Sequence, residues 1–192
     1  MKKVLTLAAL FTFLLLAVAS VAGAATRISS ASGNWSASAT WGGNPPPTAT
    51  DDVIVQGGST VTVDVANASC LSLQLGGSTL GTGAGTLAFN AGSHLTVSAP
   101  VVLGVTNNTP GSVNMASGGT LTCQGLIDTR VGTWTPGTGT VELSATNALP
   151  KNAAINYNNL LFSGGTTSFQ RNTAIAGTFT IAPGASVDCG AN

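Results

Sequence analysis

Charged side chains are scarce in this 192-residue chain, which has six Lys and Arg, six Asp and Glu, and a single His. Nucleic-acid binding depends on clustered Lys and Arg, and no such cluster occurs after Lys2 and Lys3, so the composition argues against a nucleic-acid partner. The same scarcity leaves few groups for acid–base chemistry or metal coordination. We therefore expect no cofactor, no metal centre and no enzymatic activity.

Helix signals are also missing. After the N-terminal run, no window repeats apolar residues at spacings of three and four, and Gly, Pro and β-branched residues are spread throughout. The two-residue hairpin signals Asn-Gly and Asp-Gly are absent, which disfavours antiparallel hairpins. Apolar residues alternate with a period of two instead. They do so at Val61, Val63 and Val65, at Leu71, Leu73 and Leu75, and at Val141 and Leu143.

Long apolar runs are limited to one, from Val4 to about Val18. Lys2 and Lys3 precede it, and Ala22-Gly23-Ala24 provides the small residues that signal peptidase reads. We expect residues 1–24 to be a signal peptide and the chain to be secreted or held at the cell surface. The alternative is an uncleaved membrane anchor, because the run is nearly long enough to span hydrocarbon. After cleavage, no membrane contact is expected.

One sequence pattern occurs three times, at residues 85–97, 111–123 and 177–189. Each copy has a Gly, a small hydroxyl residue, two apolar residues two positions apart, a second Gly, and two further apolar residues two apart. Residues two apart lie on one face of a strand, so each copy predicts a strand, a glycine corner and another strand. Such self-similarity is typical of repeat architectures.

The energetics favour stacking of these units. A rung of about twenty residues loses roughly 1 to 2 kcal/mol of conformational freedom per residue, whereas each buried Leu, Val or Phe returns only about 1.5 to 3 kcal/mol. Rungs stacked about 4.8 Å apart share a core and pair each other's backbone groups. We predict an all-β parallel solenoid over residues 51–192, with an antiparallel β-sandwich as the alternative.

Residues 25–50 differ from the rest, because they contain Trp35, Trp41 and Pro45-Pro46-Pro47 and little alternation. We expect this segment to be an irregular N-terminal cap, since the first rung of a solenoid exposes apolar surface and unpaired backbone groups. The alternative is a carbohydrate-binding site in which Trp35, Trp41 or Trp134 stacks on sugar rings.

Glycines and alternating aliphatic residues also carry a family resemblance. They occur at 41–43, 51–55, 58–64, 71–73 and 85–97, and again at 137–143, 158–162 and 177–181. Together these segments resemble secreted bacterial β-helix proteins, including the glycine-rich G8-type module. The resemblance implies a right-handed parallel β-solenoid on an exported protein, and many members of this class are adhesin-like. Some G8-bearing proteins bind or act on glycans, but none of their catalytic motifs can be placed on this chain.

Few residues are candidates for chemistry. The lone His94 is expected at an outward strand position, where its imidazole is part of the polar surface, and no Gly-x-Ser-x-Gly elbow accompanies it. Asp128 and Arg130 most simply form a surface ion pair. With Glu142, they are also the only charged residues close enough in sequence to serve a polysaccharide-active enzyme.

Asp51 and Asp52 are adjacent carboxylates at the start of a predicted strand. Paired carboxylates can bind calcium, but that ion prefers six or more oxygen ligands, and only Asp64 is near them in sequence. Hydrogen bonding to local backbone amides is the simpler role.

The three cysteines are Cys70, Cys123 and Cys189. The last two occupy the same place in their repeats, so we expect both to point inward. They lie about three rungs apart, roughly 14 Å, which is beyond the reach of a disulfide. We expect buried free thiols, although an odd count leaves room for one intermolecular bridge.

The C-terminal end of the predicted solenoid has little to cover it, because three residues follow Cys189. Either the solenoid is incomplete there, or the final rung docks onto another copy. Docking onto the side or cap of a second chain would be heterologous and would form a filament. We therefore expect a non-catalytic exported structural protein, as a surface scaffold, filament subunit or adhesin-like element. A carbohydrate-binding module, or a non-catalytic part of a glycan-active protein, is the alternative.

Overall fold

The computed structural model describes residues 23–77, 81–105 and 108–190, and most of the regular structure within these ranges is β-strand. Nineteen strands lie in four sheets, and the described strand pairs all run parallel. The helix described in these ranges is one short 3-10 turn, η1 (Ser38–Trp41).

The four sheets are named A to D here. Sheet A has the order β1 (Thr26–Ile28), β3 (Asp52–Val55), β6 (Ser72–Leu75), β9 (Val101–Leu103) and β12 (Leu126–Asp128). Sheet B has the order β2 (Gly33–Asn34), β4 (Thr60–Val63), β7 (Gly85–Phe89), β10 (Gly111–Asn114) and β13 (Val131–Thr135). Sheet C has the order β5 (Ala68–Cys70), β8 (His94–Val97), β11 (Thr120–Cys123), β14 (Thr140–Leu143), β16 (Asn159–Phe162) and β18 (Phe179–Ile181). Sheet D has the order β15 (Asn147–Ala148), β17 (Thr166–Ser168) and β19 (Ser186–Asp188).

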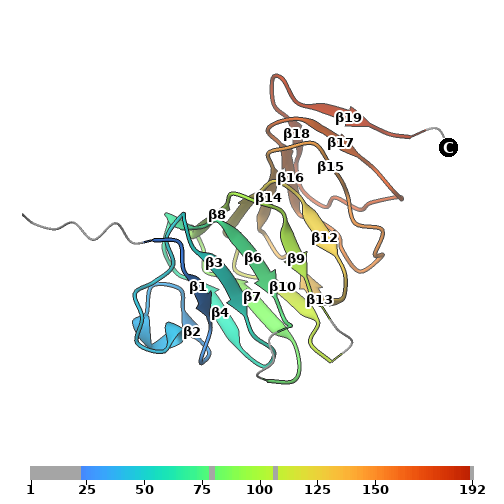
Figure 1. Cartoon of the computed structure of the whole chain (residues 1–192). Coiled ribbons are helices and arrows are strands. Elements are labelled where there is room, and N and C mark those ends of the chain that lie inside the picture. The colour runs from blue at the N-terminus through green and yellow to red at the C-terminus, as the bar shows by residue number, and fades with distance from the viewer. Residues whose placement is uncertain (1–22, 78–80, 106–107, 191–192) are drawn as a thin grey trace, which may run out of the picture.

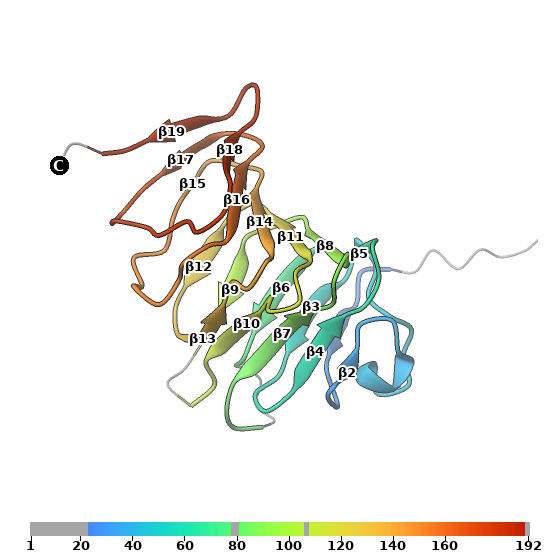
Figure 2. The same ribbon diagram turned by 180° about the vertical axis from the view of Figure 1, so that it is seen from behind.

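The chain visits sheets A, B and C in turn, first with β3, β4 and β5 and then with β6, β7 and β8. One such turn is called a rung. Successive rungs lie side by side along the molecule (Figures 1 and 2). The prediction of an all-β parallel solenoid is confirmed. The antiparallel sandwich alternative is wrong, because none of the pairs among the described strands is antiparallel.

Alternation places every second side chain of the strands in the core. Leu95 pairs with Leu121, which pairs with Val141 and, through it, with Leu160, and all four are 3% exposed or less. Burying each of these side chains contributes about 1.5 to 3 kcal/mol, so the column stabilises four rungs together. Leu71 departs from the predicted alternation: it lies in the corner between β5 and β6 and is 41% exposed.

The first two copies of the repeated pattern align as predicted, because Gly111 pairs with Gly85 and Leu121 with Leu95. The third copy does not align with them. Its first strand, β18, continues sheet C, whereas the first strands of the earlier copies lie in sheet B. A short motif of Gly, Thr and two alternating apolar residues begins β11, β14 and β18 alike, so the motif marks a strand start without specifying the sheet.

The N-terminal segment is more regular than expected. Its strands β1 and β2 add a further strand to sheets A and B, and η1 then packs against β2. Trp35 and Trp41 are each 1% exposed, lie edge to face with ring centroids 5.3 Å apart, and the Trp41 indole N–H donates to Trp35 O at 2.8 Å. Residues 25–50 are therefore a partial first rung with a tryptophan cap. Strands of two and three residues are too short to show alternation in the sequence.

In residues 23–77, 81–105 and 108–190, no helix has the length and apolar character needed to cross a membrane. The predicted signal peptide, residues 1–24, lies almost entirely outside these ranges.

Candidate functional site

The tryptophans predicted as a sugar-stacking platform lie in the core. Trp35 and Trp41 are 1% exposed and Trp134 is 8% exposed. Trp134 packs edge to face against Tyr157 at 6.0 Å, and its indole N–H donates to Asn156 O at 2.5 Å. A ring must present an open face to stack on a sugar, and this packing leaves none of the three faces open. The arrangement favours a structural role for all three side chains.

The two adjacent carboxylates at the start of β3 point to different partners. Asp51 is 2% exposed and accepts hydrogen bonds from Ala25 N at 2.9 Å, Thr48 N at 2.8 Å and Thr48 Oγ1 at 2.9 Å, with Arg27 Nε at 3.7 Å. Asp52 accepts from Ser72 Oγ instead. Asp51 therefore ties the N-terminal segment to the first full rung. Within the described ranges, no cluster of three His, Cys, Asp or Glu residues could hold a metal ion.

Asp51 gives the fold a pH dependence. Burial alone would raise the pKa of this carboxyl, but the Thr48 and Ala25 donors and the Arg27 guanidinium outweigh burial and hold the pKa below its ordinary value. A depressed pKa stabilises the fold fully above the unfolded pKa of about 3.9, and this contribution is lost as the pH falls through the folded pKa.

We therefore expect the free energy of unfolding, measured by urea titration, to fall as the pH drops below about 4. Asp51→Asn should lower it by about 1.5 to 3 kcal/mol at neutral pH, the range for hydrogen bonds to a charged group, and should flatten the acid slope. Arg27→Gln should flatten that slope only in part, because the Thr48 and Ala25 donors remain. An unchanged acid slope in Asp51→Asn would contradict this assignment.

His94, Thr122 and Glu142 form a hydrogen-bonded chain on the outer face of sheet C. The Thr122 hydroxyl donates to Glu142 Oε2 at 2.9 Å and lies 2.9 Å from His94 Nε2. Because the hydroxyl proton is directed to the carboxylate, His94 Nε2 must donate to Thr122. A hydroxyl nucleophile needs the imidazole to accept its proton, so this order does not suit nucleophilic catalysis. The chain is instead a polar link across three rungs.

Sequence reasoning missed this link, although the repeat alignment contained its signal. The first two copies place Thr120 opposite His94, and Thr122 lies two positions further along the same outward face. Glu142 is opposite Thr122 on the next strand.

The structure does not bring together the three candidates for a glycan-active centre. Asp128 ends β12 in sheet A, whereas Glu142 lies in sheet C. The predicted ion pair between Asp128 and Arg130 is also wrong: among the described residues, the one ion pair joins Arg27 to Asp51. The strand stops at Asp128, so the alternation that would place Arg130 on the same face does not continue.

The cysteines divide into two buried thiols and one exposed thiol, and all three are free. Cys70 and Cys123 are 0% exposed, and Cys123 Sγ donates to Gly125 O at 3.3 Å. Burial raises the pKa of Cys123 to about 12 and also raises the pKa of Cys70. The prediction that Cys189 points inward is wrong. This residue follows β19 in sheet D, so it is not equivalent to Cys123.

We expect Ellman's reagent at pH 8 to label one thiol per folded chain and three in urea. The thiolate is the reactive form, and burial suppresses it at Cys70 and Cys123. Cys189→Ser should remove the folded-state signal while leaving two thiols detectable in urea. Rapid labelling of a second thiol in the folded protein would contradict the assigned burial.

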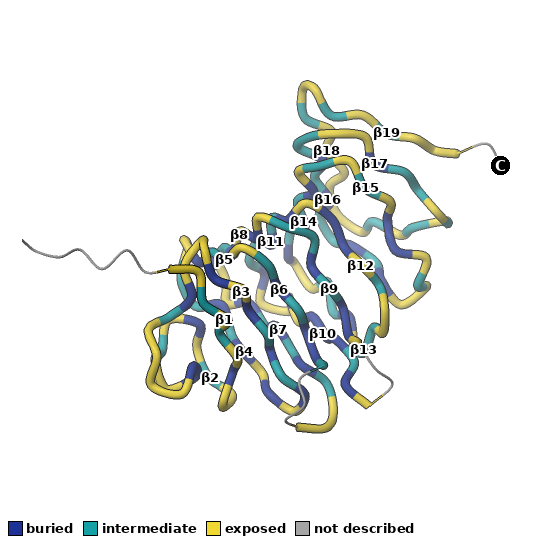
Figure 3. Tube along the Cα trace, in the orientation of Figure 1, coloured by how far each residue is buried: buried dark blue, intermediate teal, exposed yellow. Residues whose placement is uncertain are grey.

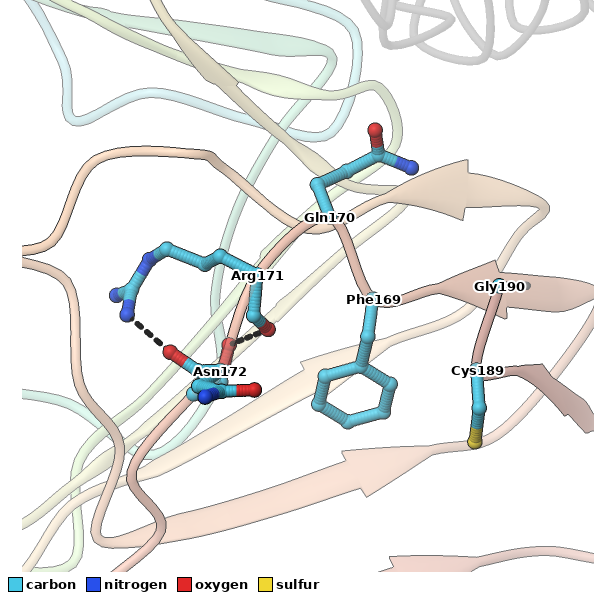
Figure 4. A pocket seen from close by; sticks show the side chains of 7 residues that line it. Phe169, Gln170, Arg171, Asn172, Cys189 and Gly190 are labelled. Atoms are coloured by element: carbon cyan, nitrogen blue, oxygen red, sulfur yellow. Dashed lines mark hydrogen bonds between the residues drawn. The ribbon is translucent and has the colours of Figure 1, made fainter. Parts of the chain in front are cut away.

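A groove of about 460 Å³ lies at the last turns of the described chain, between residues 169–173 and 189–190 (Figure 4). Its cation is Arg171, whose guanidinium already donates to the carbonyls of Asn172 and Ile155. Phe169 and Cys189 add an aromatic ring and a thiol, but the lining contains neither a carboxylate nor an imidazole. General acid–base chemistry most often uses one of these two groups.

The described titratable groups are thus dispersed. The Asp51 cluster is at the first rungs, the His94 chain crosses the middle of sheet C, and the groove beside Arg171 lies at the last turns. Comparisons with protein-family models, with curated proteins and with solved structures found no match to this chain.

Proposed function

We propose that the chain is an exported, non-catalytic structural protein that serves as a surface scaffold or adhesin-like element. The observation that carries the proposal is the contrast between a continuous core and dispersed chemistry. The buried core runs from the tryptophan cap to β16, whereas the candidate reactive groups lie on different sheets. An arrangement of this kind supports a role in which the surface itself is the functional part.

The outer faces support contact with other molecules. Outward positions of sheet C are mostly uncharged hydroxyl and amide groups, namely Ser69, Thr96, Thr120, Thr122, Thr140 and Asn159. Two aliphatic pairs, Ile28 with Ile54 and Val102 with Ile127, lie on the outer face of sheet A on either side of Gln74. Of these residues, Ile28 and Ile127 are 41% and 48% exposed. Uncharged and apolar surfaces associate without charge repulsion.

The export step is tested by expressing the chain with and without residues 1–24 in a bacterium. Secretion of the full chain, with a new N-terminus near Ala25, is the expected result. Retention of the full chain in the cytoplasm would contradict export.

The non-catalytic role is tested with a panel of polysaccharides, by measuring the release of reducing ends. We expect no release by the wild type or by the triple variant Asp128→Asn, Arg130→Gln, Glu142→Gln. Activity in the wild type that the triple variant loses would overturn the proposal. Tryptophan emission should also stay unchanged as each polysaccharide is added, because the three indoles are buried.

A further inference from the structure

Apolar side chains in core positions are left open on β18. Phe179 pairs with Leu160 and Ile181 with Phe162, so they occupy the same inward columns. The two residues on β16 are 1% and 0% exposed, whereas Phe179 is 40% and Ile181 45% exposed. The last strands are exposed along most of their length (Figure 3). Phe179 contacts Phe169 edge to face, with ring centroids 6.0 Å apart, but no described strand pairs with the open edge of β18 as β18 pairs with β16.

The backbone of β18 is open on the same side. Leu160 N donates to Thr178 O, and Ala182 N donates to Phe162 O. In this alternating parallel ladder, the N–H and C=O groups of Phe179 and Ile181 point away from β16. Natural edge strands are usually protected by Lys, Pro or a bulge, and the Phe-Thr-Ile sequence of β18 has none of these.

The opposite end of the coil is better covered. There η1 lies along β2, with Thr40 Oγ1 donating to Asn34 O at 2.8 Å and the Trp41 indole N–H donating to Trp35 O. Pro45-Pro46-Pro47, which follow, have no backbone N–H to offer. At the opposite edge of sheet C, the inward side chains of β5, Ala68 and Cys70, are 5% and 0% exposed, so β5 offers no apolar surface to match β18, whereas a second β18 does.

We propose that β18 is a docking surface for a second copy of this chain, with the two coils joined tail to tail across a two-fold axis. The two β18 strands run antiparallel, with Thr180 opposite the partner's Thr180. Phe179 then lies opposite the partner's Ile181, and Ile181 opposite the partner's Phe179. Both of these pairs combine an aromatic with a β-branched side chain, a favourable cross-strand combination.

Backbone geometry fits the same register. In an antiparallel ladder, hydrogen-bonded pairs alternate with non-hydrogen-bonded pairs. The outward N–H and C=O groups of Phe179 and Ile181 form the two hydrogen-bonded pairs, and the Thr180 pair lies between them. Charge does not oppose this contact, because residues 159–190 contain one basic residue, Arg171, and one acidic residue, Asp188. A contact of this symmetry closes on itself, which replaces the filament expected from the sequence with a dimer.

The first test is sedimentation velocity over a concentration series. We expect a reversible monomer–dimer equilibrium, and Ile181→Lys should raise the dissociation constant by about thirtyfold or more, as for loss of a central interface side chain. Leu71→Lys is the matched control, because Leu71 is 41% exposed but lies in the corner between β5 and β6. It should leave the dissociation constant unchanged. A wild type that stays monomeric at every concentration, or a dimer broken by Leu71→Lys rather than Ile181→Lys, overturns the proposal.

The second test fixes the register and does not depend on how Ile181→Lys folds. In a Cys189→Ser background, Thr180→Cys places two thiols on the two-fold axis, with Cα atoms about 4.5 Å apart and within disulfide range. Oxidised glutathione should convert the two thiols to one intermolecular disulfide and be reduced to two glutathione molecules. Thr96→Cys, exposed on the same face of sheet C but away from the edge, is the control.

We expect a cross-linked dimer from Thr180→Cys and none from Thr96→Cys in the same background. Equal cross-linking of the two variants, or none from Thr180→Cys, overturns the proposed register. The inference goes beyond the proposed function and is measured on purified chains, so its failure leaves the tests of export and of glycan activity unaffected.

Discussion

Gly85→Ala is expected to lower the free energy of unfolding by about 3 kcal/mol or more, the upper range for forced overpacking. At the corner before β7, Gly76 N donates to Val55 O at 2.7 Å. A Cβ on Gly85 would lie 2.2 Å from both of these backbone atoms. Backbone cannot rotate away as a side chain can, so the β6–β7 corner must open.

Gly92→Ala is the matched control, because Gly92 is the second glycine of the same repeat. It has a φ of +72°, but an added Cβ would meet nothing within 4 Å. We expect a loss of only about 1 to 2 kcal/mol from the left-handed backbone conformation. Urea titration followed by far-UV circular dichroism measures both. Equal losses in the two variants would show that close approach is not the reason for glycine at position 85.

Trp41→Ala should cost about 3 to 5 kcal/mol, the usual range for deleting a large buried aromatic side chain. The substitution removes the edge-to-face contact with Trp35 and the hydrogen bond to Trp35 O, and it opens the cap over the first rung. The measurement is again urea titration, and in a Trp134→Phe background the emission of Trp35 is a local probe. That emission should shift to longer wavelength as water reaches the ring.

Trp41→Phe separates packing from hydrogen bonding. It keeps much of the ring volume but leaves the buried Trp35 carbonyl without its indole donor, so a smaller loss of about 1 to 3 kcal/mol is expected. If Trp41→Ala lowers the free energy of unfolding by less than about 1 kcal/mol, the cap is contradicted. Deleting a side chain that is 1% exposed and closes the core should cost more than that.

The parallel stack could be predicted from the sequence because its signal is local. Alternation fixes which side chains face inward, and the spacing of the first two repeats fixed the pairing of Leu95 with Leu121. The sheet to which a strand belongs is not a local property, which is why Cys189 was misplaced. The motif before β18 also starts β11 and β14, and only the pairing with β16 assigns it to sheet C.

The candidate sites were harder to predict, because they depend on neighbours in adjacent rungs. The link from His94 through Thr122 to Glu142 joins three strands that are consecutive in sheet C but separated in the chain by two whole turns. Sequence proximity suggested Asp128 and Arg130 instead, because nothing in the sequence shows that β12 ends at Asp128. The open edge of β18 can be recognised only from the structure, by comparing the exposure of its inward side chains with that of their partners on β16.

The regular register of sheet C also determines how the molecule would respond to force. Val141, Leu160 and Phe179 stack in one column at intervals of about 19 residues, and each strand is bonded only to the strands beside it. A force applied to the C-terminal residues would break these hydrogen bonds one rung at a time, starting with the last rung. Each rung that detaches would lengthen the tether by about 65 Å, since an extended chain spans roughly 3.3 to 3.6 Å per residue. In a dimer joined through β18, the two β18 edges would be buried in the same contact. The free ends of the two solenoids would then be the tryptophan-capped ends, and unfolding under force would begin there.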